Sequence, residues 1–133
     1  MGSQIKCTFK IDSWNEKPFS ESEDGPTLNR ASVKQTYSGS LEAKSTIEYL
    51  MTTFLDERSS FIGIEEIIGE LDGKSGSFLL QHNGTHEEGV AKSTFEIIPH
   101  SGTGELEGIT GSGHYEATHD QSRFKMFYEF KEK

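Results

Sequence analysis

Apolar and polar residues alternate at both ends of the chain, over residues 5–11 and again over residues 124–130, where Phe127 is the exception. A period of two is typical of a β-strand that buries only one of its faces. Both ends of the chain are therefore predicted to be strands.

The spacing of the glycines extends this prediction through the second half of the chain. Eleven glycines fall between Gly63 and Gly113, and few of the gaps between them could hold a helix of typical length, about 11 residues. The longest gap, residues 90–101, contains Pro99 and a run of residues that prefer strands, which disfavours a helix there as well. The second half is predicted to be β-structure.

Residues 41–55 fit two patterns. Their apolar residues follow the spacing of a helical stripe, and a partly different set fits one face of a long strand. The helical set is Ile47, Leu50, Met51, Phe54 and Leu55. Because Thr46, Tyr49 and several of their neighbours prefer strands, we predict a strand. A helix lying across an open sheet is the alternative.

Eight strands are predicted in all. They cover residues near 4–11, 28–38, 41–55, 60–71, 75–86, 90–98, 111–117 and 122–131. Between the first two strands, residues 12–27 carry two prolines and a cluster of acidic residues, which indicates a long exposed connection. Trp14, within this connection, is expected to pack back onto the body of the protein.

The other connections are short and carry residues typical of hairpin turns. The expected turns are Ser38-Gly39, Asp56-Glu57, Asp72-Gly73 and Glu88-Gly89, with Asn83-Gly84 as a rival. Short connections imply antiparallel neighbours, and closure removes exposed strand edges. The fold class predicted is all-β: a closed, antiparallel, eight-stranded up-and-down β-barrel that forms a single domain over residues 1–133. A two-sheet sandwich is the alternative.

Charge and composition limit the partners. The 13 Lys and Arg and 22 Asp and Glu give a net charge of −9, and no run of Lys or Arg offsets it. Such a surface repels phosphate backbones and anionic lipids, so nucleic acid and membranes are not expected as partners. The chain has no apolar run of membrane-spanning length and a single cysteine, Cys7, which predicts a soluble, cytoplasmic protein.

Residues 61–71 and 78–80 carry large apolar side chains at both odd and even positions. One face of such strands can fill a barrel, whereas the other would face water unless something covered it. We therefore expect the protein to be a homo-oligomer.

Two patterns suggest a phosphate site or a metal site, and neither fits the requirements of such a site. The glycine-rich segment 102–113 contains Glu105 and Glu107 and opens no helix, so it does not suit a phosphate. His82 and His86 lie four residues apart, about 13 Å on a strand, which is too far to share one ion. No metal site and no cofactor are predicted.

Polar residues inside apolar runs give a sharper hypothesis. Glu48 lies within IEYLM, and Glu65 lies within IGIEEII beside Glu66, so one of each group should face an apolar environment. Burial raises the pKa of a carboxyl group and suits it to proton transfer near neutrality. Of Gln81 and His82, one must point inward. Candidate ligand-binding residues are Glu48, Glu65, Gln81, His82 and Tyr49, with Tyr37 and Tyr115 as further hydroxyl donors, and no catalytic residue is assigned.

Several strings together resemble an uncharacterised, mostly bacterial family, the domain of unknown function 3224 family. They are SWNEKPF (13–19), RASVKQTYSG (30–39), IEYLM (47–51), SFIGIEEIIGELDGKSGSFLLQHNGT (60–85) and IIPHSGTGELEGITGSG (97–113). The resemblance implies a barrel similar to those of allene oxide cyclases and dirigent proteins, which are commonly oligomeric and, in plants, hold an apolar small molecule. It does not imply cyclase activity, because the plant enzymes' catalytic residues have no matched positions here.

Three functions are consistent with these predictions. The first is binding of a small apolar or amphipathic molecule in the barrel interior, with the candidate residues as polar anchors. The second is an isomerase or cyclase in which a buried Glu transfers a proton. The third is a structural or partner-binding module whose barrel is filled by its own side chains.

Overall fold

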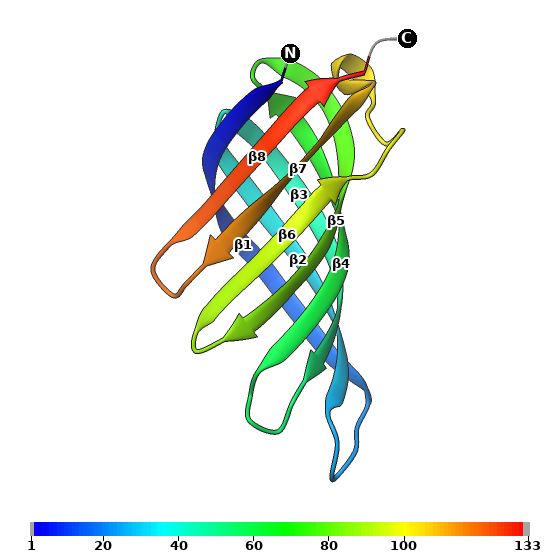
Figure 1. Cartoon of the computed structure of the whole chain (residues 1–133), viewed down its shortest axis with the longest axis vertical. Coiled ribbons are helices and arrows are strands. Elements are labelled where there is room, and N and C mark those ends of the chain that lie inside the picture. The colour runs from blue at the N-terminus through cyan, green and yellow to red at the C-terminus, as the bar shows by residue number, and fades with distance from the viewer. Residues whose placement is uncertain (1, 132–133) are drawn as a thin grey trace.

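The computed structural model describes residues 2–131 and shows a closed barrel in which eight strands follow one another in chain order, each antiparallel to the next (Figure 1). The strands are β1 (Ser3–Ser20), β2 (Thr27–Gly39), β3 (Leu41–Thr53), β4 (Ser59–Leu71), β5 (Lys74–Glu87), β6 (Val90–Ile97), β7 (Ile109–Ala117) and β8 (Ser122–Phe130), with one short 3₁₀ helix, η1 (Gly104–Leu106), before β7. The predicted fold class is confirmed. Residues 41–53 are a strand, so the alternatives of a helix across an open sheet and of a sandwich are wrong.

Two hairpin turns show why this chain forms a meander. Asp72 and Gly73 both have positive φ, 49° and 84°, and so do Glu88 and Gly89, at 51° and 79°. Two successive residues with positive φ match the right-handed twist of the flanking strands. The β2–β3 connection falls on Ser40, beside the predicted pair, and the predicted Asp56-Glu57 turn lies in the loop between β3 and β4.

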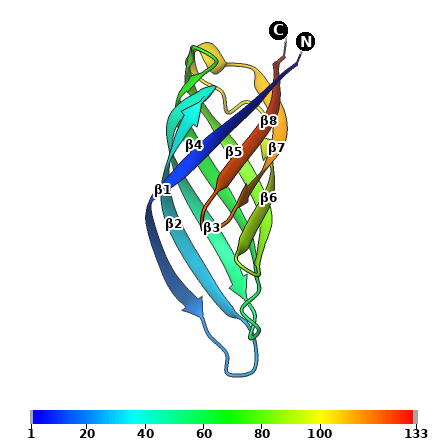
Figure 2. The ribbon, with the colours of Figure 1, turned by 90° about the vertical axis from the view of Figure 1, so that its left-hand side faces the viewer.

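The first hairpin differs from its prediction. β1 continues to Ser20 and pairs with β2 as far as Leu28, so the predicted connection over residues 12–27 is mostly strand. This half of the hairpin projects beyond the barrel, where neither face is covered (Figures 1 and 2). Because neither face is buried, the sequence of this segment shows no alternation of apolar and polar residues. Pro18 is tolerated because the outer edge of β1 pairs with no other strand there. Trp14 lies 6.2 Å from Tyr49, ring to ring, and remains 46% exposed.

Inward-facing glycines accommodate aromatic rings from the neighbouring strand. A Cβ on Gly63 would lie 2.5 Å from the ring of Tyr49, and one on Gly84 would lie 2.5 Å from the ring of Phe61. Each glycine is the register partner of the residue whose ring covers it. Gly84 therefore belongs to the interior of β5, and the rival turn at Asn83-Gly84 is wrong.

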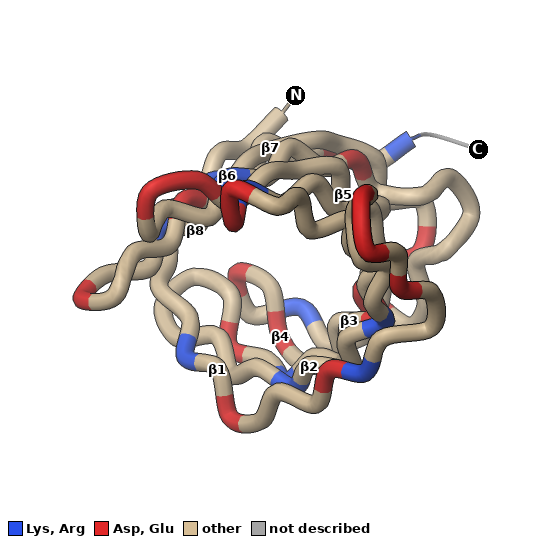
Figure 3. The backbone as a smooth tube through the Cα atoms, turned by 90° about the horizontal axis from the view of Figure 1, so that it is seen from below, with Lys and Arg blue, Asp and Glu red and all other residues tan. Residues whose placement is uncertain are grey.

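Two groups of buried apolar side chains line the barrel interior. The upper cluster, at the end that carries both termini, is the larger and contains Phe78, Leu80 and Phe124. The lower cluster consists of Ala31, Val33, Ile47, Tyr49 and Phe61, with Met51 and Tyr115 packed against it. Figure 3 looks along the barrel from this lower end, around which Asp and Glu residues are distributed.

The barrel closes where β1 meets β8, over five residue pairs between Ser3 and Cys7 on β1 and Phe124 and Tyr128 on β8. The hydroxyl of Ser122 ends this pairing, because it accepts a hydrogen bond from the Phe9 amide at 3.1 Å and donates one to the Phe9 carbonyl. Beyond this point the two strands separate. Within residues 2–131, no helix has the length and apolar character needed to cross a membrane.

Candidate functional site

A chain of buried polar side chains crosses the barrel interior. Glu65 on β4 and His82 on β5 are 0% and 1% exposed, and His82 Nε2 lies 2.6 Å from Glu65 Oε1. On its other side, His82 Nδ1 lies 3.0 Å from the hydroxyl of Ser93 on β6. An acid, a base and a hydroxyl are thus linked in one line away from solvent.

The chain continues from Glu65 toward β2. The Tyr37 hydroxyl donates a hydrogen bond to Glu65 Oε2, and the side-chain amide of Gln35 donates one to the Tyr37 oxygen at 3.3 Å. Burial, and next the charge of the neighbouring Glu65 carboxylate, raise the pKa of Tyr37 well above its ordinary value. Tyr37 therefore stays a neutral donor to Glu65.

Two proton arrangements satisfy this chain. The Ser93 hydroxyl also lies 3.1 Å from the Thr94 carbonyl; if it donates there, His82 Nδ1 must donate to Ser93, and the proton between His82 Nε2 and Glu65 Oε1 is carried by one of these two atoms. If Ser93 donates to His82 Nδ1 instead, His82 is neutral and keeps its proton on Nε2, toward Glu65. The two arrangements differ by one proton and use the same heavy-atom positions.

A pair of tyrosines lies between this chain and the lower end of the barrel. The hydroxyls of Tyr49 on β3 and Tyr115 on β7 lie 3.0 Å apart and join strands on opposite sides of the barrel. The ring of His82 contacts both, at centroid distances of 6.0 Å and 5.5 Å. Burial raises the pKa of Tyr49 well above its ordinary value and that of Tyr115 to about 12, so both hydroxyls are neutral.

Three of the candidate residues, Glu65, His82 and Tyr49, lie on the inner face, as their role requires. Glu48 and Gln81 do not, and their placement as interior anchors is wrong. Both are register neighbours of Ile64, whose side chain points away from the interior because the next residue, Glu65, points into it. The inward position of Glu65 therefore fixes the outward position of both Glu48 and Gln81.

Glu48 has a different environment from the one predicted. Its side chain is 41% exposed and forms an ion pair with Arg30 at 2.8 Å on the outer face. A hydrogen bond from Ser32, and next the one from Arg30, hold the pKa of Glu48 below its ordinary value. With Gln81, Leu50 and Ile62 it borders a groove of about 540 Å³ outside the barrel.

Two members of the polar chain, Gln35 and Ser93, were not predicted. Each occupies an apolar position in the alternation of its strand: Gln35 lies between Val33 and Tyr37, and Ser93 precedes Phe95 by two residues. A polar residue in register with an apolar face is the signal that could have identified them. Among residues 2–131, no three His, Cys, Asp or Glu side chains are placed to hold a metal ion.

Fold and site together define a small antiparallel β-barrel protein with an acid–base chain buried across its interior. The chain belongs to a family described as protein of unknown function (DUF3224), whose model matches residues 5–131. A solved structure of a DUF3224 protein with unknown function from Shewanella oneidensis MR-1 is 27% identical to it. The match has a TM-score of 0.82 and covers 99% of this chain and 100% of that one.

No curated protein matches the chain. The family model confirms the predicted family. The likeness to allene oxide cyclases and dirigent proteins stays a prediction.

Proposed function

We propose that the protein binds a small amphipathic molecule in the barrel interior, with the molecule's polar group on the chain that includes Glu65 and His82. The observation that carries this proposal is the chain itself. Replacing buried ionic groups by apolar residues of similar volume is often neutral or stabilising, so stability alone does not account for them.

A spare hydrogen-bonding group supports the proposal. The hydroxyl of Ser45 is buried beside Gln35, its register partner on β2, and has no hydrogen-bond partner among the described residues. Buried polar groups are nearly always paired. A hydroxyl or carbonyl on a bound molecule would supply the missing partner, whereas a second carboxylate would add an unfavourable buried charge next to Glu65.

Entry is proposed at the lower end. The hydrogen bond between Tyr49 and Tyr115 joins two neutral groups, and a bond of this kind contributes about 1 kcal/mol. In the proposed route, breaking this bond and moving either ring opens a path from the lower end of the barrel to His82. The lower cluster is also the smaller of the two apolar clusters, so fewer contacts resist such a movement.

Displacement of a fluorescent probe tests this function. N-phenyl-1-naphthylamine, a neutral apolar dye, should gain fluorescence with the protein, and decanol should displace it more effectively than decanoate. Glu65→Gln should weaken decanol binding roughly tenfold, because a hydrogen bond to a charged group is worth about 1.5–3 kcal/mol. Glu66→Gln, the adjacent carboxylate on the outer face, is the matched control.

Ser45→Ala is a milder second variant, which should weaken decanol binding severalfold. Equal decanol affinity in Glu65→Gln and Glu66→Gln would show that the polar chain is not the anchor. If the wild-type protein binds neither dye nor decanol, the barrel is a filled structural module.

Proton transfer to the bound molecule is a second candidate function, favoured by the two proton arrangements around His82. In this reaction the Glu65 carboxylate removes a proton from the carbon next to a carbonyl group and returns one to the same position. Decan-2-one incubated with the protein in D₂O should then gain deuterium at that carbon, and the Glu65→Gln protein should give only the background rate.

Self-association is proposed for the outer face of β3 and β4. Leu50, Ile62, Ile64 and Ile68 are large apolar residues exposed there, and a patch of this kind is commonly covered by a second subunit. Light scattering at micromolar concentration should give a mass above that of one chain, and Ile64→Lys should lower it. A monomeric mass for the unmodified protein would contradict the proposal.

A further inference from the structure

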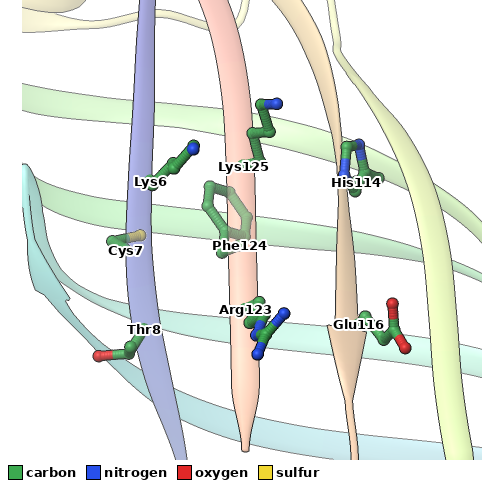
Figure 4. A pocket seen from close by; sticks show the side chains of 8 residues that line it. All are labelled: Lys6, Cys7, Thr8, His114, Glu116, Arg123, Phe124 and Lys125. Atoms are coloured by element: carbon green, nitrogen blue, oxygen red, sulfur yellow. The ribbon is translucent and has the colours of Figure 1, made fainter.

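Basic side chains gather on one outer face of the barrel, although the net charge of the chain is −9. Lys6 on β1 and His114 on β7 are both register partners of Lys125 on β8, so the three side chains form a row across three strands (Figure 4). Arg123 is the next outward residue on β8. These residues are far apart in the sequence, and only strand register brings them together.

This row is unfavourable as it stands. Neighbouring strands lie about 4.8 Å apart, and like charges directly opposite one another destabilise a sheet. The ion pairs among the described residues involve Arg30, Arg58 and two histidines, and none includes Lys6, Lys125 or Arg123. Although the chain has 22 acidic residues, no described carboxylate forms an ion pair with these three side chains.

The row borders a hollow large enough for a small molecule. Its volume is about 560 Å³, and its lining includes Lys6, Thr8, His114, Arg123 and Lys125. Glu116 is the one carboxylate in this lining; it is the register partner of Arg123 but lies beyond ion-pair distance from it. The hollow therefore offers several cationic donors and the Thr8 hydroxyl.

An apolar surface lies next to the cations. Phe127 is the next outward residue along β8 after Lys125, and its side chain is 47% exposed. Phosphorylated metabolites combine charged phosphoryl oxygens with a less polar remainder. A row of cations beside an exposed ring is complementary to that combination.

We propose that this hollow binds a small phosphorylated molecule, with its phosphoryl oxygens on Lys6, Lys125 and His114. Two linked phosphoryl groups suit the row best, because three basic side chains on three adjacent strands span about 10 Å. The site lies on the outside of the barrel and uses no residue of the buried chain. The proposal therefore does not rest on the proposed function of the interior.

Calorimetric titration with inorganic pyrophosphate at low ionic strength tests the proposal on the wild-type protein. Pyrophosphate should bind more tightly than orthophosphate, and its affinity should fall as salt is added. Lys125→Gln should weaken pyrophosphate binding at least about fivefold, because it removes a charge-assisted contact at the centre of the row. Lys44→Gln, an exposed lysine on β3, should leave the affinity unchanged.

Thermal unfolding gives a second readout that needs no ligand. Without added anion, Lys125→Gln should raise the melting temperature, because repulsion from Lys6 is lost. When pyrophosphate is added, only the melting temperature of the wild-type protein should rise substantially. Equal affinity for pyrophosphate in the two lysine variants would overturn the proposal, as would binding no tighter than that of chloride. Tighter binding of a single-stranded oligonucleotide would instead assign the row to nucleic acid.

Discussion

The upper and lower halves of the barrel interior are built differently. The upper cluster is a continuous apolar core in which Phe78, Leu80 and Phe124 are almost fully buried. The lower half holds fewer apolar residues, the Tyr49–Tyr115 hydrogen bond and, at its border with the upper half, the polar chain through His82. The difference indicates that apolar packing dominates the upper half, whereas the lower half and its border hold a network of buried hydrogen bonds.

The largest expected effect lies in the upper half. Phe78→Ala should lower the free energy of unfolding by about 3–5 kcal/mol, because it leaves a cavity in a fully packed core. Phe61→Ala, the matched change in the lower half, should cost less, since that ring packs in a smaller cluster near the opening. Urea denaturation measures both, and equal losses would contradict the division into two halves.

The next effect concerns the polar chain. Glu65→Leu should lower the free energy of unfolding by roughly 3 kcal/mol, because it leaves His82 buried without its partner. The double variant Glu65→Leu, His82→Leu should be more stable than Glu65→Leu alone, which denaturation of the variants in parallel would show. A double variant that loses the sum of the two single losses would mean that these side chains do not act as a pair.

The four tyrosines predict that the stability of the folded protein depends on pH. Burial is the first cause that raises the pKa of each of the four, to about 12 for Tyr115. The folded protein favours the neutral hydroxyl, so this stabilisation is fully present below the ordinary value near 10 and is lost as pH rises above it.

Absorbance at 295 nm should therefore show little tyrosinate at pH 10 in the native protein and much more in guanidinium. A full tyrosinate signal from protein that keeps its circular dichroism would contradict this.

The smallest effect belongs to the Tyr49–Tyr115 pair. Tyr115→Phe removes one hydroxyl of a neutral hydrogen bond and should lower the free energy of unfolding by about 1 kcal/mol. Hydrogen exchange of the amides around His82 should become faster, because the two rings that lie between His82 and the lower end of the barrel are then less restrained. Exchange as slow as in the wild-type protein would mean that the pair does not limit access to the interior.

The fold was largely predictable from the sequence because glycine placement and hairpin residues act locally. The inner face of the barrel was not, since residues 61–71 are apolar at both odd and even positions. Choosing between Glu65 and Glu66 requires knowing which strands lie on either side. The same ambiguity on β3 and β5 led to the misplacement of Glu48 and Gln81. The projecting half of β1 escaped prediction because it packs against nothing that would impose alternation.

Distance along the chain also hid the basic row. Lys6, His114 and Lys125 share no motif, and their proximity depends on the register of three strands. A sequence without a run of Lys or Arg can therefore still form a local group of basic side chains on the folded surface.

The closure between β1 and β8 is short, at five residue pairs against thirteen between β3 and β4. Thermal fluctuations that separate neighbouring strands should occur most often along this seam. Lys6 and Lys125 stand opposite each other across it, so electrostatic repulsion loosens the seam when no anion is present. A bound phosphoryl group would tie the two edges together, and occupancy outside the barrel would then govern how readily the interior exchanges with solvent.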